Sequence, residues 1–194
     1  MAYISERREE LLSAADELQK AQFGRQIRGL EKIYENKENR SGTQKVFTEL
    51  FSCWGSLKSP AASLGICYLF SSILTGSYEF KLVLLGKEFW LEEKPVEMMW
   101  RPAHFFECFE EDMELVIKEL KGRFPRLCSA EEEAVRFSCA EYYLAAVCAL
   151  CRDVTEEITG SREFTKMNKT EDFYLFFGRY QGEGEILWRI SDTV

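Results

Sequence analysis

Apolar residues recur at helical spacing along the N-terminal part of the chain. Two stripes follow each other there: Leu11, Ala15 and Leu18, then Phe23, Ile27, Leu30 and Tyr34. The step of five residues between the stripes breaks the helical register, and Gly24 lies at that step, so we expect a kink. A third apolar face within residues 43–54 predicts another helix after a polar loop at residues 35–43. Residues 1–58 are therefore predicted to form a helical N-terminal region.

The segment from Ser59 to Tyr78 carries no charged residue. Its length matches a membrane-spanning helix, but Ser and Thr recur through it, and Pro60, Gly65 and Gly76 dilute its hydrophobicity further. We therefore expect a buried helix over residues 60–75, with Pro60 in its first turn and Gly76 after its last, and no membrane segment.

After Gly76 the apolar period shortens to two residues, which is typical of strands. Residues 78–101 contain three apolar runs separated by turn signals, and they predict an antiparallel meander with Phe89–Leu91 as its middle strand. Aromatic and apolar runs on either side of Gln181–Gly184 predict a hairpin over residues 173–190. Because an isolated hairpin has little to bury against, we expect it to join the meander in one antiparallel sheet of about five strands.

Two further helices are predicted between the meander and the hairpin. The first, after Pro102, has an apolar face and an acidic face, and Glu110 lies on the acidic, solvated side. The second, over residues 130–158, is apolar nearly all round, which is typical of a central helix. Ser129 and Glu132 match a capping box at its start. Glu141 interrupts its apolar surface, so we expect this carboxylate to be paired and costly to remove.

Together these elements predict an α+β fold in a single domain over residues 1–194. The sheet-containing core occupies residues 59–194, and its sheet packs against the apolar helices at 60–75 and 130–158. Apolar residues make up 46% of the chain and charged residues 30%, a composition that supports a packed core and excludes a disordered chain.

The net charge of −8 is unevenly distributed, with +1 over residues 1–58 and −6 over residues 129–194. An acidic surface repels phosphate backbones, which disfavours nucleic-acid binding, and it attracts basic protein partners. Seven cysteines occur without the spacing of a disulfide framework, and no apolar signal core follows the N-terminal charges. We therefore expect a reduced, cytoplasmic protein whose thiols are mostly buried.

Common catalytic and cofactor-binding motifs are missing from the sequence. His104 is the only histidine, which leaves no HExxH or Cys₂His₂ pattern, and no glycine-rich phosphate loop or GxSxG is present. Cys148 and Cys151 form a CxxC pair, but they fall late in an apolar helix, where buried structural thiols are expected. We predict no cofactor and no metal.

One cluster combines several chemical groups at the start of the helix after Pro102. The spacing brings the following polar residues together on one flank: Arg101, His104, Glu107, Cys108 and Glu111. A helix N-terminus disfavours a protonated imidazole and the glutamates favour it, so His104 is a candidate for titration near neutral pH. This flank is the candidate polar site, and a solvated helix surface is the competing interpretation.

Two functions from different classes remain open. The first is a non-enzymatic acidic binding module that neutralises or escorts a basic partner, as immunity proteins and adaptors do. The alternative is a small enzyme or small-molecule-binding protein that uses the region from Arg101 to Glu111. A concave pocket holding His104 and at least two other members of the cluster would favour the alternative. The pattern leaves the partner's identity and the oligomeric state open.

Overall fold

The structure is a computed structural model that describes residues 2–54, 59–91 and 95–193. The α-helices in these ranges are α1 (Ala2–Glu35), α2 (Lys37–Trp54), α3 (Phe70–Thr75), α4 (Phe109–Arg123), α5 (Ser129–Asp153), α6 (Thr155–Thr159) and α7 (Arg162–Lys166). The strands are β1 (Ala61–Tyr68), β2 (Phe80–Leu85), β3 (Val96–Trp100), β4 (Lys169–Arg179) and β5 (Gly184–Arg189). Short 3₁₀-helices are η1 (Phe89–Leu91), η2 (Ala103–Phe106) and η3 (Ile190–Thr193).

The five strands form one sheet in the order β3-β2-β1-β4-β5. This arrangement confirms the α+β class, the five strands, the helical N-terminal region and the C-terminal hairpin. The sheet is mixed, however, because β1 and β4 pair in parallel while the other neighbours are antiparallel. The prediction of a purely antiparallel sheet is wrong because it left out β1, the strand that joins the two antiparallel parts.

The predicted helix over residues 60–75 is wrong for most of its length. Residues 61–68 form β1, and only Phe70–Thr75 is helical. A central strand is buried on both faces and reads as a continuous apolar run, so its period cannot distinguish it from a buried helix. Gly65 leaves no room for a side chain, because an added Cβ atom would lie 2.6 Å from the ring of Phe176 on β4. Gly76 ends α3 in a left-handed conformation, as expected.

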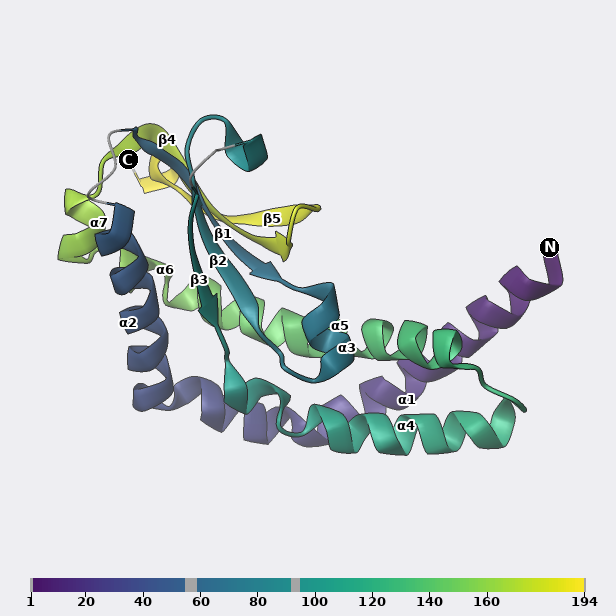
Figure 1. The fold of residues 1–194 in the computed structure, drawn as a ribbon. Coiled ribbons are helices and arrows are strands. Elements are labelled where there is room, and N and C mark those ends of the chain that lie inside the picture. The colour runs from purple at the N-terminus through teal and green to yellow at the C-terminus, as the bar shows by residue number, and fades with distance from the viewer. Residues whose placement is uncertain (1, 55–58, 92–94, 194) are drawn as a thin grey trace.

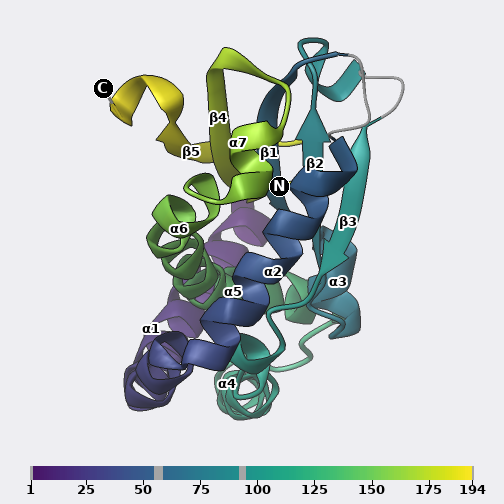
Figure 2. The same ribbon diagram turned by 90° about the vertical axis from the view of Figure 1, so that its left-hand side faces the viewer.

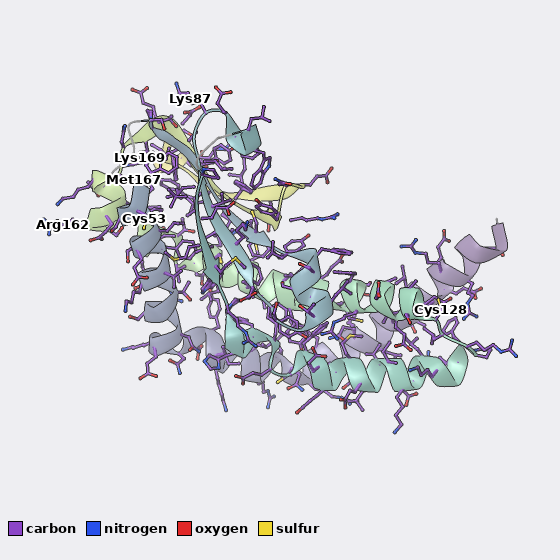
Figure 3. All side chains as sticks on the ribbon, viewed as in Figure 1. Cys53, Lys87, Cys128, Arg162, Met167 and Lys169 are labelled. Atoms are coloured by element: carbon purple, nitrogen blue, oxygen red, sulfur yellow. The ribbon has the colours of Figure 1, made fainter. Side chains whose placement is uncertain are left out.

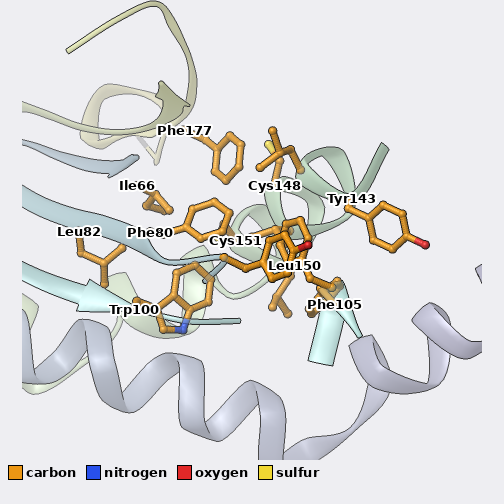
Figure 4. Close-up of a cluster of buried hydrophobic side chains, with 14 of the residues drawn as sticks. Ile66, Phe80, Leu82, Trp100, Phe105, Tyr143, Cys148, Leu150, Cys151 and Phe177 are labelled. Atoms are coloured by element: carbon orange, nitrogen blue, oxygen red, sulfur yellow. The ribbon is translucent and has the colours of Figure 1, made fainter. Parts of the chain in front are cut away.

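Helices cover one face of the sheet, as Figure 1 shows, and α5 runs beneath it. The view turned by 90° in Figure 2 shows α2 crossing in front of α5 on the same side. Phe80, Trp100 and Phe177 point from the sheet toward Cys148 and Cys151 of α5, as seen in Figure 4. α5 meets the sheet on one side and α1 and α4 on another, so its apolar residues contribute to the core on both sides.

A smaller apolar cluster covers the opposite face of the sheet. Cys67, Val83 and Phe176 lie there under the side chains of Phe89 and Trp90, which η1 carries. The prediction of a strand at Phe89–Leu91 is therefore wrong, and this segment instead folds back over the sheet as a single turn of 3₁₀-helix. The strand was expected from three consecutive apolar residues between turn signals, but such a short run carries little periodic information.

The helical regions also differ in detail from the sequence expectation. α1 continues through Gly24 without a break, and the loop expected at residues 35–43 shrinks to Asn36. The Asn36 Oδ1 atom accepts hydrogen bonds from the backbone N–H groups of Glu38 and Asn39, and this cap starts α2 at once. The helix predicted over 130–158 divides into α5 and α6, and the short helix α7 follows before β4.

Candidate functional site

The predicted polar site lies where β3 leads through η2 into α4. His104 Nδ1 lies 2.8 Å from Glu107 Oε1, and their side chains are 56% and 63% exposed. Cys108 is half-buried immediately before α4, and burial together with nearby carboxylates raises its pKa. Glu111 lies in the first turn of α4. The flank therefore carries one exposed hydrogen-bonded pair and a thiol that stays protonated at neutral pH.

Only part of this cluster faces a shared cavity. Arg101 and His104 line a cavity of about 240 Å³ together with Asn39, Thr43 and other residues of α1, α2 and α5. The described lining of that cavity does not include Glu107, Cys108 or Glu111. The structure thus brings His104 together with Arg101 on one side and with Glu107 on the other, and among the described residues neither Cys108 nor Glu111 lines the cavity.

A buried polar network crosses the helical layer close to this region. Asp112 of α4 is 1% exposed, and its Oδ2 atom accepts hydrogen bonds from Tyr143 Oη at 2.6 Å and Gln19 Nε2 at 3.3 Å. Burial, followed by the bond to Asp112, raises the pKa of Tyr143, so this hydroxyl is a donor at neutral pH. These hydrogen bonds link Gln19 of α1, Asp112 of α4 and Tyr143 of α5.

Glu110 is exposed, as expected for the acidic face of α4, and its carboxylate also takes part in a second network. Arg136 of α5 donates to the Ile73 carbonyl oxygen at 2.6 Å and to the Glu110 carboxylate, which Tyr78 also contacts. These hydrogen bonds, with that of Arg136 the largest effect, hold the pKa of Glu110 below its usual value. By contrast Glu141, expected to be paired, is exposed and forms no hydrogen bond or ion pair with the described residues.

The larger of the two clefts beside α5 has a volume of about 710 Å³ and lies between α3, α4 and α5. Its apolar floor, formed by residues such as Met113 and Ile117, is rimmed by charged groups of both signs. Arg136 is engaged with Glu110, and Lys121 Nζ lies 2.8 Å from Glu132 Oε1. Because its charges neutralise each other locally, this cleft offers little selectivity for either sign of ligand.

The other cleft is an apolar groove of about 550 Å³ between α1 and α5. Its apolar and aromatic lining consists of Phe23, Ile27, Leu30, Tyr34, Phe105, Tyr142, Ala145, Ala146 and Ala149. We call this feature the α1/α5 groove. Its α1 side is the second apolar stripe of the sequence, while the first stripe is buried at Leu11 and Ala15.

The α1/α5 groove explains why α5 is apolar on nearly every side. Ala145 and Ala149 are exposed on its floor, and the side chain of Ile27 on its wall remains 44% exposed. By length and composition α5 is the one helix among the described residues that is apolar enough to cross a membrane, and half of its most apolar window is buried inside the protein. α5 is central, as expected, since it packs against α1, α4 and β5, but its side along this groove is exposed at Ala145 and Ala149.

Charge in the α1/α5 groove has a single sign. Of the described residues that line it, only Glu31 and Glu35 are charged, and neither forms an ion pair within the described part of the chain. In the acidic C-terminal region, Glu131 pairs with Arg7, Glu132 with Lys121 and Glu157 with Arg40, while others such as Glu133 and Glu141 form no ion pair among the described residues. The groove therefore combines an apolar lining with charges of one sign, whereas the cleft between α3, α4 and α5 carries charges of both signs.

The seven thiols comprise four that are buried, two that are exposed and the half-buried Cys108. Cys67, Cys139, Cys148 and Cys151 are buried, and burial raises the pKa of the first three to about 12 and that of Cys151 well above its ordinary value. Cys53 and Cys128 are exposed at opposite ends of the molecule, as Figure 3 shows. Among the described residues no group of three or more His, Cys, Asp or Glu side chains is arranged to hold a metal ion.

No family model, curated protein or solved structure matches this chain. The interpretation of the site therefore rests on its geometry and chemistry.

Proposed function

We propose that the protein is a non-enzymatic binding module of the cytoplasm, and that a basic partner protein docks in the α1/α5 groove. The single observation that carries this proposal is the exposed apolar lining of the groove beside two unpaired carboxylates. Exposed apolar surface rimmed by polar groups marks interaction sites in soluble proteins. Aromatic side chains such as Phe23, Tyr34 and Tyr142 supply the large, rigid contact area that protein interfaces favour.

The charge of the chain supports a basic partner. The protein has a net charge of −8, and Glu31 and Glu35 add negative charge at the groove itself. Complementary charge speeds the encounter of two proteins and rejects partners of the wrong sign. A second copy of the same chain would bring the two glutamates toward their own counterparts, so like-charge repulsion disfavours self-association through this groove.

The enzyme alternative has weaker support. Its candidate site needed His104 and at least two other members of the cluster in one pocket, and only Arg101 lines a cavity with His104 among the described residues. We therefore place the function at the groove.

The test is an affinity capture from cells of the source organism with three forms of the protein. Ala145→Arg puts a positive charge on the exposed floor of the groove, and Ala21→Arg makes the same change at an exposed position of α1 that does not line it. Both positions are exposed on helices, so both variants are expected to fold, which circular dichroism checks. We expect a basic protein to be retained by the wild type and by Ala21→Arg and lost from Ala145→Arg. Equal retention by all three forms, or capture of acidic proteins only, contradicts the proposal.

A further inference from the structure

We propose that the occupant of the α1/α5 groove is a single amphipathic α-helix whose apolar stripe lies on the alanine floor and whose Lys or Arg residues face Glu31 and Glu35. This inference rests on the proposed function and specifies the shape and chemistry of the partner segment. It follows from the two helices that form the groove, from the small residues on its floor and from the polar groups it lacks.

The walls of the groove have the dimensions of a helix-binding site. On α1 the lining runs from Phe23 to Glu35, which corresponds to about 18 Å of helix axis and so to an occupant of about three turns. On α5 the floor presents Ala145, Ala146 and Ala149, whose short side chains allow another helix to approach closely. Apolar residues at i, i+3, i+4 and i+7 of the incoming helix would fill such a groove.

The chemistry of the lining selects a helix over an extended peptide. An extended segment exposes unpaired N–H and C=O groups, which cost free energy when they are buried against apolar walls. The polar side chains among the described lining are two carboxylates and two tyrosines, and the Tyr142 hydroxyl already donates to Asp16 Oδ1 at 2.7 Å. A helix satisfies its own backbone hydrogen bonds and therefore needs no partners from these walls.

The two carboxylates of the groove favour positive charge along one flank of the bound helix. Glu31 and Glu35 lie one helical turn apart on α1 and mark one rim of the groove. Arg28, Lys32 and Lys37 are near the two carboxylates in the sequence, but none of them forms an ion pair with either carboxylate among the described residues. The guanidinium of Arg40 is 5.8 Å from the ring of Tyr34 and pairs with Glu157 instead. Lysine or arginine residues spaced three or four positions apart on the bound helix would meet both carboxylates.

The experiment uses the full chain and synthetic peptides of about 16 residues, long enough for partial helicity. The probe has Leu at i, i+3, i+4 and i+7 with Lys along one flank, and it carries a fluorophore for anisotropy. The comparison peptides are a scrambled sequence of the same composition and a form with Glu in place of Lys. We expect the Lys-flanked peptide to bind at least about tenfold more tightly than either comparison peptide.

Two protein variants locate the binding. Ile27→Lys changes an apolar groove residue that is 44% exposed, and Leu115→Lys changes a residue of α4 that is 46% exposed and lies outside the groove lining. We expect Ile27→Lys to weaken peptide binding at least about tenfold and Leu115→Lys to change it less than about twofold. The double variant Glu31→Lys, Glu35→Lys is expected to reverse the preference so that the Glu-flanked peptide binds more tightly.

The outcomes separate this inference from the proposed function. If capture of a basic partner depends on Ala145 while no helical peptide binds, the binding function stands and the helical mode is wrong. If the Lys-flanked peptide binds with the expected variant pattern while no partner is captured, the helical mode stands and the proposed cellular function is wrong. Equal binding of the scrambled peptide, or formation of a dimer that Ile27→Lys abolishes, overturns the inference.

Discussion

Tyr143→Phe isolates the hydrogen bond that the Tyr143 hydroxyl donates to the buried carboxylate of Asp112. The ring of Tyr143 packs against Phe23, Phe106 and Phe109, and phenylalanine preserves that packing. The lost bond is 2.6 Å long and ends on a carboxylate that is 1% exposed. The remaining donor from Gln19 lies at 3.3 Å, too far to replace a short bond to a charged acceptor.

A hydrogen bond to a charged group contributes about 1.5–3 kcal/mol, so we expect Tyr143→Phe to lower the free energy of unfolding by about 2 kcal/mol. For a chain of this size that corresponds to a fall in Tm of about 4–8 °C. The assay is urea unfolding at neutral pH, followed by circular dichroism and analysed with the slope held common to both proteins.

The adjacent residue provides the matched control. Tyr142 also donates to a carboxylate, Asp16, and this bond raises the pKa of Tyr142 to about 12, but the pair lies at the surface. Tyr142→Phe is expected to change the free energy of unfolding by less than about 0.5 kcal/mol because water replaces a lost surface bond. Equal shifts in the two variants would refute the reasoning, since burial would then not set the strength of these bonds.

We expect His104→Ala to leave partner capture unchanged, because the exposed pair with Glu107 lies outside the groove. A functional defect of a hundredfold or more in a folded His104→Ala protein would instead favour the enzyme alternative. Glu110→Ala should lower the free energy of unfolding by about 1 kcal/mol, because Glu110 forms an ion pair with Arg136. Glu141→Ala should lower it by less than about 0.5 kcal/mol, and the Tm values of the two variants test this difference. The Arg7 guanidinium, followed by the Cys128 N–H group, lowers the pKa of Glu131 to about 2. Its carboxylate therefore stabilises the fold fully above about pH 4.5, and this contribution disappears as the pH falls through about 2. Glu131→Gln should lower the Tm near neutral pH and have the same Tm as the wild type at the acidic end of a series of Tm measurements. Ellman titration of the native protein should leave four thiols unreacted until denaturant is added, and rapid labelling of all seven contradicts the burial of Cys67, Cys139, Cys148 and Cys151.

Elements with a regular spacing of apolar residues, and with one apolar and one polar face, could be predicted from the sequence. The strand at Val96–Trp100 was predictable because apolar residues recur at every second position, and the C-terminal hairpin because aromatic and apolar runs flank a glycine-containing turn. The strand β1 was not, because burial on both faces removes the alternation that marks a strand. The loop expected from the polar run at residues 35–43 was also wrong. The side chain of Asn36 caps α2, so the second helix begins directly after the first.

The candidate site was only partly predictable for a related reason. The spacing placed His104 beside Glu107 correctly, because residues three apart on a helical turn are neighbours. Glu110 is exposed as expected, but its contact with Arg136 and the lack of an ion pair at Glu141 among the described residues could not be predicted, because both depend on how α4 and α5 pack. The groove had a sequence signal, namely the second apolar stripe of α1 and the apolar surface of α5 at Ala145 and Ala149, but two such stripes are equally typical of a closed core.

The parallel pairing of β1 and β4 also determines when the sheet can form during synthesis. Leu64 pairs with Leu175, so the central strand pair joins positions about 110 residues apart. At ordinary rates of translation the ribosome needs roughly 5–20 s to make that intervening stretch. Until then β1 has an unpaired edge and an uncovered face, and α5, which covers that face, emerges only shortly before β4 does. The N-terminal two-thirds of the chain therefore leaves the ribosome with an apolar strand exposed, and chaperone binding at β1 would protect it from aggregation during this interval.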